Sequence, residues 1–260
     1  WKSLATTPAR CARDATLKPV STEIQQHETM SEPKPFKPES DAPTLPSDVV
    51  DALPGKFLVF DGPDGSGKST QLKMFLNAAK GAGLKVKEVR EPGGTEIGEK
   101  IRDALLEHLD REEMSLRCEM LLYMASRAQL CEQVIDPALK RGELVVADRF
   151  VSSTYAYQGA AGGIPFTEID QAAEIAMQGV SPDATLIFDV DQETAASRLN
   201  PLLDRMEAKG AAFHQRVREG YQTLITGDPD RLSYLGIDAR GSESQVFSNI
   251  VDALRERFVD

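Results

Sequence analysis

The sequence predicts an α/β fold: a five-stranded parallel sheet covered by helices on both faces. From residue 57 onward, short apolar runs alternate with longer amphipathic segments. This alternation is typical of parallel sheets, whose strands are buried on both faces and joined by helical crossovers. Ligands bind at the carboxyl ends of the strands in such folds, so we expect the functional residues to follow the strands directly.

The elements follow from the pattern of apolar residues. The predicted strands are 57–61, 85–89, 143–148, 184–189 and 234–237. The predicted helices are 69–80, 95–109, 112–140, 165–178, 191–199, 204–225 and 242–258. Residues 1–53 instead combine many prolines with charged and small polar residues, a composition that does not repay the entropy of ordering. We therefore expect a disordered extension over 1–53 and a single domain over 54–260.

Composition limits the classes of partner and location. The 260 residues are 41% hydrophobic, which suffices for one buried α/β domain. The net charge of −11, with no long basic run, argues against a nucleic acid partner. No apolar stretch approaches the roughly 20 residues that span a bilayer, so we expect no membrane partner. The cysteines Cys11, Cys118 and Cys131 show no metal-ligand spacing and indicate reduced thiols in the cytoplasm.

Residues 62–69 carry the most specific motif, a glycine-rich loop of the form G-x-x-x-x-G-K-S between a predicted strand and a predicted helix. Its glycines let backbone N–H groups surround a phosphate, to which the helix N-terminus adds favourable dipole charge. Lys68 is expected at the outer phosphates of a nucleoside triphosphate and Ser69 at Mg²⁺. The alternative is an ordinary glycine-rich turn before a helix.

Two other strand ends carry arginines. Arg90 precedes a Pro-Gly-Gly turn after the second predicted strand, where its guanidinium could hold phosphate oxygens or lie on the surface at a helix entrance. Asp148 ends the third predicted strand and is expected to help hold Mg²⁺. Arg149 follows it and could neutralise charge on a transferred phosphoryl group. The alternative for Asp148 and Arg149 is a structural ion pair.

Two polar patterns suggest a nucleobase site. Tyr123 and Arg127 lie four residues apart on a predicted helix and so share a face, which suits stacking on a base and bonding its carbonyl oxygen. An ordinary cation–π or packing contact is the alternative. The polar run 152–159 follows Arg149 and is either part of a second nucleotide's pocket or a capped surface helix.

Taken in order, segments 57–69, 90–95, 121–129, 148–159 and 189–191 resemble the thymidylate kinases. The motifs D-G-x-D-G-x-G-K-S-T-Q, R-E-P-G-G-T and D-R-F…A-Y-Q-G carry this resemblance, which covers residues 55–258. It implies a three-layer P-loop NTPase fold and Mg²⁺-dependent transfer of the ATP γ-phosphate to dTMP, forming dTDP. It also implies a homodimer packed through helices near 95–109 and 112–140.

The resemblance implies roles for individual residues. ATP would be bound by Gly62, Pro63, Asp64, Gly65, Ser66, Gly67, Lys68, Ser69 and Thr70, and Mg²⁺ by Ser69 and Asp148. The dTMP site would use Arg90 and Arg149 for the phosphate, Tyr123, Arg127, Ser153 and Gln158 for the base, and Asp64, Tyr157 and Tyr221 for the sugar. Lys68, Arg149 and Asp64 would be catalytic.

One departure from the family pattern concerns a further cation. The family supplies it either from an arginine after the acid of the loop or from a basic lid after the fourth strand. Gly65 follows Asp64 here, and the lid region 198–205 is short and carries only two arginines. Our first hypothesis is that Arg205 covers the donor phosphates as a catalytic cation, with Arg198 as the second choice.

Three rival functions remain open at this stage. Another nucleoside monophosphate kinase or a deoxynucleoside kinase would share the loop. A P-loop switch or motor is disfavoured, since no N-K-x-D guanine signature occurs and the chain is acidic. A silent nucleotide-binding scaffold is disfavoured by the intact Lys68, Ser69, Asp148 and Arg149.

Overall fold

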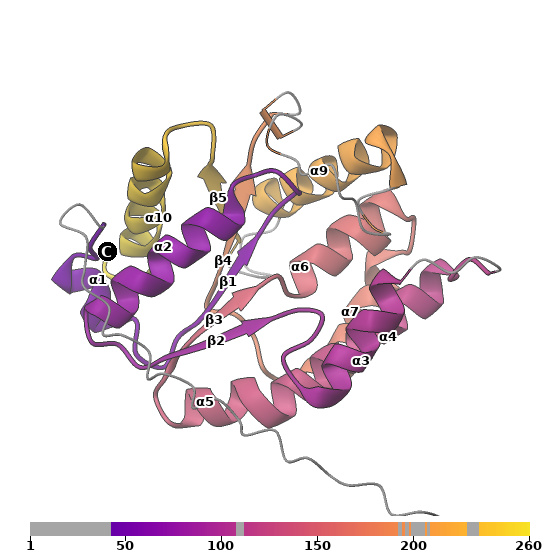
Figure 1. The fold of residues 1–260 in the computed structure, drawn as a ribbon, viewed down its shortest axis with the longest axis horizontal. Coiled ribbons are helices and arrows are strands. Elements are labelled where there is room, and N and C mark those ends of the chain that lie inside the picture. The colour runs from indigo at the N-terminus through magenta and orange to yellow at the C-terminus, as the bar shows by residue number, and fades with distance from the viewer. Residues whose placement is uncertain are drawn as a thin grey trace, which may run out of the picture. The chain divides into compact units, whose positions relative to one another are not determined.

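The computed structural model describes residues 43–107, 112–191, 194–195, 198, 206, 209–227 and 234–260. Its central element is an all-parallel sheet with the strand order β2-β3-β1-β4-β5 (Figure 1). The strands are β1 (Phe57–Asp61), β2 (Val86–Arg90), β3 (Leu144–Asp148), β4 (Ala184–Asp189) and β5 (Tyr234–Asp238). The predicted five-stranded parallel sheet is confirmed.

Alternate residues of β1 enter two separate cores. Leu58 and Phe60 pack on one face of the sheet, and Phe57 and Val59 pack on the other. All four side chains are fully buried. Successive side chains of a strand point to opposite faces, and both faces of this strand are covered. Every position is therefore apolar, and the sequence shows a continuous apolar run.

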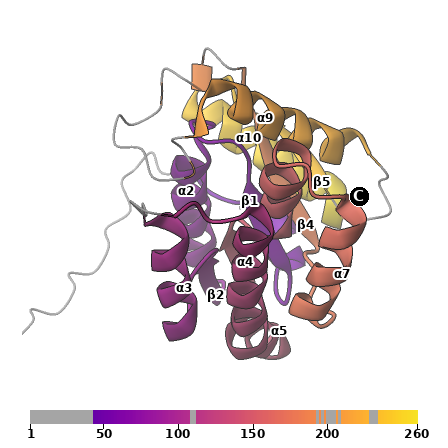
Figure 2. The same cartoon turned by 90° about the vertical axis from the view of Figure 1, so that its right-hand side faces the viewer.

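Helices cover both faces of the sheet (Figure 1). On one face lie α1 (Ser47–Ala52), α2 (Lys68–Gly81) and α10 (Glu243–Phe258). On the other lie α4 (Leu116–Leu130), η1 (Cys131–Ile135), α5 (Asp136–Lys140), α6 (Val151–Thr154), η2 (Tyr155–Ala161), α7 (Phe166–Met177) and α9 (Ala211–Thr226). The helix α3 (Glu96–Leu106) packs beside α4 (Figure 2).

The predicted extension through residue 53 is wrong for residues 43–53. This segment forms α1, whose Val49 is buried together with Leu53 in the same core as α2 and α10. Arg255 of α10 donates from Nε to Asp48 Oδ2 at 2.7 Å, which adds a polar contact to the apolar packing. Val49 and Leu53 are too few to show a helical period in the sequence. Residues 1–42 lie outside the described part of the chain.

The predicted helix 112–140 is instead two α-helices with a π-helical turn between them. Ser115 caps α4 by accepting a hydrogen bond from the Cys118 N–H at 3.4 Å. The π-helical residues Cys131–Ile135 precede Pro137, whose nitrogen has no hydrogen to donate to the preceding turn. We attribute the interruption to Pro137, which the pattern of apolar residues does not reveal.

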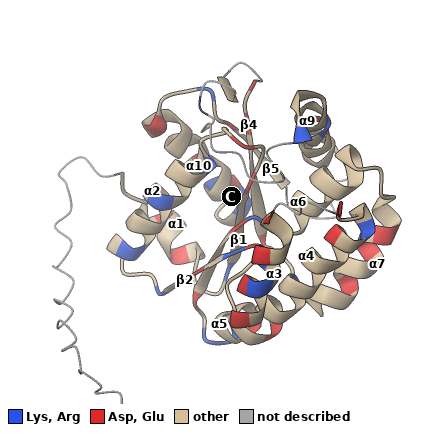
Figure 3. Ribbon diagram, turned by 45° about the vertical axis from the view of Figure 1, so that its right-hand side comes forward, with Lys and Arg blue, Asp and Glu red and all other residues tan. Residues whose placement is uncertain are grey.

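Further boundaries differ from the predicted ones. The helix predicted over 204–225 is observed from Ala211, after Gly210 with a positive φ of 87°. The polar run after Arg149 forms α6 and η2 and is almost entirely buried, so a surface helix is excluded. Most of the predicted helix 191–199 lies outside the described residues. Among those described, no helix combines the length and apolarity needed to cross a bilayer. Acidic and basic residues are intermixed over the helices (Figure 3).

Candidate functional site

The glycine-rich loop lies between β1 and α2, as its motif predicts. Gly67 precedes the first turn of α2 with a φ of 84°, in the left-handed region that favours glycine. Gly65 has a φ of 78°, and a Cβ there would collide with the carbonyl oxygen of Ala195. Residue 65 is therefore held to glycine by both conformation and space. This explains why no arginine follows Asp64.

A cavity of about 470 Å³ opens on this loop, and we call it the P-loop cavity. It is lined by Pro63, Asp64, Gly65, Ser66, Gly67, Lys68, Ser69, Thr70, Gln71, Arg198, Ala239, Gly241, Glu243 and Val246. The predicted ATP residues thus line one cavity, except Gly62. The buried Ser66 hydroxyl has no hydrogen-bond partner among the described residues, which leaves it available to a bound group.

Lys68 is buried at the start of α2, and its ammonium donates a hydrogen bond to Asp148 Oδ1. The register of the sheet explains the contact, because Asp148 pairs with Phe60 on the neighbouring strand and so ends level with the loop. Burial and the nearby Arg149 charge lower the pKa of Lys68 below its ordinary value, while Asp148 opposes this shift. The fold therefore brings Lys68 and Asp148 together beside the loop.

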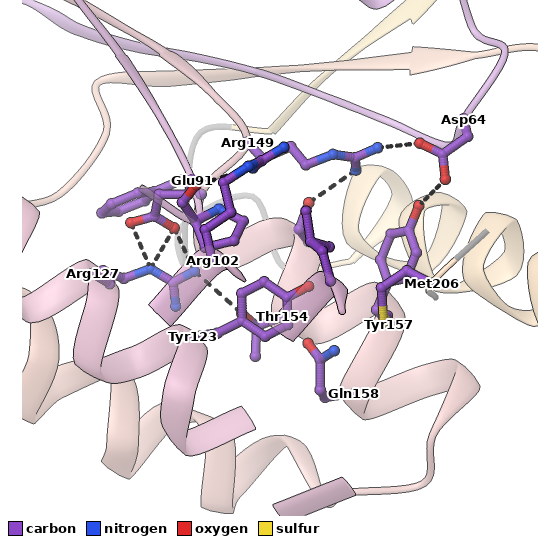
Figure 4. A pocket seen from close by; sticks show the side chains of 14 residues that line it. Asp64, Glu91, Arg102, Tyr123, Arg127, Arg149, Thr154, Tyr157, Gln158 and Met206 are labelled. Carbon is purple, nitrogen blue, oxygen red and sulfur yellow. Dashed lines mark hydrogen bonds and ion pairs between the residues drawn. The ribbon is translucent and has the colours of Figure 1, made fainter. Parts of the chain in front are cut away.

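Arg149 connects the loop to the buried interior. Its backbone has a φ of 68°, an uncommon conformation for a non-glycine residue. From Nη2 it donates to Asp64 Oδ1 (Figure 4). From Nη1 it donates to the Gly62 carbonyl oxygen at 3.1 Å. These bonds hold the guanidinium directly beneath the phosphate-binding loop.

Asp64 and Tyr157 form the next contact of this chain. The Tyr157 hydroxyl donates to Asp64 Oδ2 at 2.8 Å. Burial opposes ionisation of Asp64, but the Arg149 charge and the Tyr157 hydrogen bond outweigh it and hold the Asp64 pKa below its ordinary value. Burial raises the pKa of Tyr157 well above its ordinary value, so its hydroxyl remains a donor.

Sequence reasoning missed Asp61, the fully buried last residue of β1. Its carboxylate accepts hydrogen bonds from the hydroxyls of Ser152, Ser153 and Tyr221, the last at 2.7 Å. It also lies 3.3 Å from Nη1 of Arg149. The available signal was a carboxylate at the end of a run of apolar residues. A carboxylate that is buried with such a strand needs hydrogen-bond or charged partners.

A second cavity of about 110 Å³ adjoins Asp64 and Arg149, and we call it the Tyr123 cavity (Figure 4). It is lined by Asp64, Glu91, Pro92, Arg102, Leu106, Tyr123, Arg127, Arg149, Phe150, Ser153, Thr154, Tyr157, Gln158 and Met206. The predicted base residues Tyr123, Arg127, Ser153 and Gln158 all line it. Because Asp64 lines both cavities, the two sites meet at this residue.

Arg127 is held by a buried ion pair that the sequence did not indicate. It donates from Nη2 to Glu91 Oε2 at 2.6 Å and from Nε to the same oxygen at 2.9 Å. Nη2 also donates to the Thr154 hydroxyl at 3.2 Å. The guanidinium plane is thus fixed before any ligand arrives.

Two residues predicted for the dTMP site, Arg90 and Tyr221, are not among those that line the Tyr123 cavity. Arg90 instead donates to Glu99 Oε2 at 2.8 Å and lines neither cavity. Tyr221 is buried beneath Arg149, with its hydroxyl 3.3 Å from Nη1. Arg205 lies outside the described residues. By contrast Arg198, our second choice, lines the P-loop cavity.

Arg102 lines the Tyr123 cavity and was missed. It donates from Nη1 to the Pro92 carbonyl oxygen at 3.0 Å. The sequence offered one indication of this position. Arg102 lies seven residues, or two helical turns, after Thr95, the N-cap of α3, and therefore on the same face of the helix as Thr95.

Comparisons with known proteins identify the family of the chain. A family model described as thymidylate kinase matches residues 60–250. A thymidylate kinase of Exiguobacterium sp. is 44% identical over 207 residues, covering 79% of this chain and 96% of its own. One from Caldanaerobacter subterraneus is 42% identical over 204 residues, with coverages of 78% and 96%. The crystal structure of thymidylate kinase from Ehrlichia chaffeensis superposes with a TM-score of 0.61 at 29% identity, with coverages of 78% and 99%.

Proposed function

The chain belongs to the thymidylate kinase family, and on that premise we propose that it transfers phosphate between its two cavities. The reaction is the ATP-dependent phosphorylation of dTMP to dTDP, a step towards dTTP. ATP would occupy the P-loop cavity and dTMP the Tyr123 cavity, with the phosphates meeting near Asp64. The observation that carries this assignment is that Asp64 lines both cavities and is bonded to Arg149.

On the donor side, the backbone amides of the loop and the Lys68 ammonium would bind the β- and γ-phosphates. The unpartnered Ser66 hydroxyl supports a polar ligand at this loop. Arg198 would supply the lid cation, because Nη1 lies near the loop and donates to the Ala239 carbonyl oxygen at 3.2 Å. This position makes Arg198 our assignment for the lid cation.

On the acceptor side, Arg149 and Arg102 would hold the dTMP phosphate. Arg90 would join them only by releasing Glu99. Tyr123 would stack on the base and Arg127 would donate to its O4, while Asp64 would accept from the 3′-hydroxyl of the sugar. Tyr157 and Tyr221 would support Asp64 and Arg149 by the contacts described above.

The chemistry needs no general base. The phosphate of dTMP is itself the nucleophile and is ionised near neutral pH, so catalysis rests on positioning and charge neutralisation. Lys68 would lie against the transferred group from the donor side and Arg149 from the acceptor side. Lys68 is buried and the Arg149 side chain is only 20% exposed, so their charges act at a lower local dielectric than in water, where each interaction is stronger.

Magnesium fits the residues present at the loop. The Ser69 hydroxyl is exposed to the P-loop cavity, and the Asp148 carboxylate stands at the adjoining end of β3. Hydroxyl and carboxylate oxygens, completed by waters and phosphate oxygens, are the ligands that Mg²⁺ prefers. A bound Mg²⁺ would neutralise charge on the phosphates of ATP. Ser69 and Asp148 would hold it there.

A homodimer through α3 and α4 is part of the proposal. The side chains of Ile97 on α3 and Leu121 on α4 are 53% and 57% exposed, although both are large and apolar. The helices pack side by side (Figure 2). Leu105, Met120 and Met124 are buried within the chain and do not contribute to such a face. Sedimentation at low micromolar concentration tests this assignment, and a monomer would contradict it.

We also propose a cytoplasmic location without a nucleic acid or membrane partner. Cys118 and Cys131 are both unpaired, as expected in a reducing compartment. The excess of acidic residues disfavours a polyanion as partner.

The test of the proposed function is ADP production over a panel of acceptors. We expect turnover with dTMP, weaker turnover with dUMP, and none with GMP, UMP or thymidine. The preference for dTMP over dUMP should be modest, because the methyl group that distinguishes the two bases is worth only about 1–3 kcal/mol. Preference for a purine monophosphate would overturn the assignment of the Tyr123 cavity.

Arg149→Lys keeps the charge but loses the fork geometry, so it should lower kcat by at least about tenfold.

A further inference from the structure

We infer that Glu119 fixes the orientation of the Gln158 side-chain amide and thereby selects pyrimidines that carry a hydrogen at N3. Glu119 is a positioning residue in this inference, which rests on the proposed function. It lines neither the P-loop cavity nor the Tyr123 cavity. Its effect on the substrate would pass through Gln158.

The geometry joins three side chains from separate elements. Glu119 on α4 is 1% exposed, and its Oε1 accepts a hydrogen bond from Nε2 of Gln158 at 2.8 Å. Gln158 on η2 is 2% exposed and lines the Tyr123 cavity, below Tyr123 in the view of Figure 4. Both Glu119 oxygens lie 3.1 Å from Nζ of Lys209.

The carboxylate determines which end of the amide faces it. An ionised carboxylate can only accept hydrogen bonds, and the Lys209 ammonium favours the ionised form. The NH₂ end of Gln158 must therefore point to Glu119. The amide oxygen is then left to face the cavity, as an acceptor in a fixed direction.

This acceptor distinguishes pyrimidine bases by their N3 atoms. Thymine and uracil carry N3–H, which can donate to the Gln158 oxygen. The N3 of cytosine carries a lone pair instead, so two acceptors would face each other in a buried site. A site built to receive a donor rejects the analogue that lacks it much more strongly than it rejects a missing methyl group.

Arg127 would contribute a separate part of the same discrimination. Its guanidinium can only donate, which suits the O4 of thymine and not the amino group of cytosine. Glu119 therefore accounts for only part of the preference for dTMP over dCMP. Changing Glu119 alone should weaken this preference without abolishing it.

The first experiment compares kcat/KM for dTMP, dUMP and dCMP in the wild type and in Glu119→Gln. A glutamine at 119 can donate as well as accept, so the Gln158 amide can reverse and offer its NH₂ to cytosine N3. We expect the dTMP to dCMP ratio to fall at least tenfold, while the dTMP to dUMP ratio stays within about twofold. The matched control, Glu132→Gln at an exposed glutamate of η1, should leave both ratios unchanged.

A swapped pair separates positioning from a structural role. Gln158→Glu alone would set two carboxylates against each other and should raise KM for dTMP at least tenfold. In the double variant Glu119→Gln with Gln158→Glu, the glutamine donates to the new carboxylate, whose free oxygen again accepts from N3–H. We expect the double variant to recover the dTMP to dCMP ratio that Glu119→Gln loses. A structural partner of Lys209 would not produce this recovery.

The outcomes separate the two proposals. A folded wild type without activity on dTMP would overturn the proposed function. An active wild type would overturn the inference alone if Glu119→Gln kept its dTMP to dCMP ratio. If thermal unfolding shows that Glu119→Gln does not fold, the double variant decides. Failure of a folded double variant to prefer dTMP over dCMP as the wild type does would then overturn the inference.

Discussion

Nη1 of Arg149 lies 3.3 Å from Oδ1 of Asp61, so the last residue of β1 orients the cation that follows β3. Asp61 has no solvent exposure, and it accepts further hydrogen bonds from the hydroxyls of the buried Ser152 and Tyr221. Since the backbone of Arg149 is in the left-handed region, its position depends on these side-chain contacts. The buried carboxylate therefore prepares Arg149 for a phosphate before the substrate binds.

Asp61→Asn should lower kcat for dTMP by about tenfold to a hundredfold, because the amide cannot pair with the Arg149 charge and presents an NH₂ group to existing donors. Steady-state ADP production measures kcat, and thermal unfolding measures the stability of each variant. Asp183→Asn is the matched control, since Asp183 accepts from the Phe57 N–H at 2.8 Å at the opposite end of β1. The control should lose stability and keep kcat. Equal kcat values in the two variants would contradict the assigned role of Asp61.

The parts of the site that the sequence predicted are those encoded locally. The loop motif and Arg149 follow directly from short segments at strand ends, where the parallel sheet must bring them together. Asp61, Arg102 and the Glu91–Arg127 pair depend instead on which side chains face each other after folding. Nothing in a single sequence distinguishes Arg90, which pairs with Glu99, from an arginine that faces a ligand.

Arg198→Ala should lower kcat by about tenfold to a hundredfold if Arg198 neutralises charge on the donor phosphates. Arg198 lines the P-loop cavity, so the KM for ATP should also rise. Arg218→Ala is the control, because Arg218 pairs with Asp189 at 3.1 Å and lines neither cavity. Unchanged ATP kinetics in Arg198→Ala would transfer the assignment to Arg205.

Cys131 should resist alkylation while Cys118 reacts. Burial, with the neighbouring Glu91 charge, raises the pKa of Cys131 to about 12, and its side chain is almost inaccessible. Cys118 is exposed. At pH 9 only about one thousandth of Cys131 is thiolate, so labelling of Cys131 by iodoacetamide should stay far below that of Cys118 at both pH 7 and pH 9. Peptide mapping by mass spectrometry measures both sites, and rapid labelling of Cys131 in the native protein would contradict the structure.

The same shift predicts a direction for stability at alkaline pH. The pKa of Cys131 is higher in the folded state than its ordinary value of 9.0. Its contribution to the free energy of unfolding is therefore fully present below pH 9 and is lost as the pH rises towards 12. Cys131→Ala should remove this part of the alkaline loss. Parallel pH dependences of the unfolding free energy in the two proteins between pH 9 and 11 would contradict it.

Glu91→Gln should lower the free energy of unfolding by about 3–5 kcal/mol, because it leaves the buried Arg127 charge without its partner. The KM for dTMP should rise as well, since Arg127 loses the two bonds that fix its plane. Glu168→Gln is the matched control: Glu168 pairs with Arg117 on the surface, where such a pair contributes at most about 1 kcal/mol. Denaturant unfolding of both variants measures the difference. If Glu91→Gln lowered the free energy of unfolding by no more than Glu168→Gln does, the buried pair would not hold Arg127 in place. The orientation of Arg127 towards the base would then have to arise from Thr154 and the packing of α4.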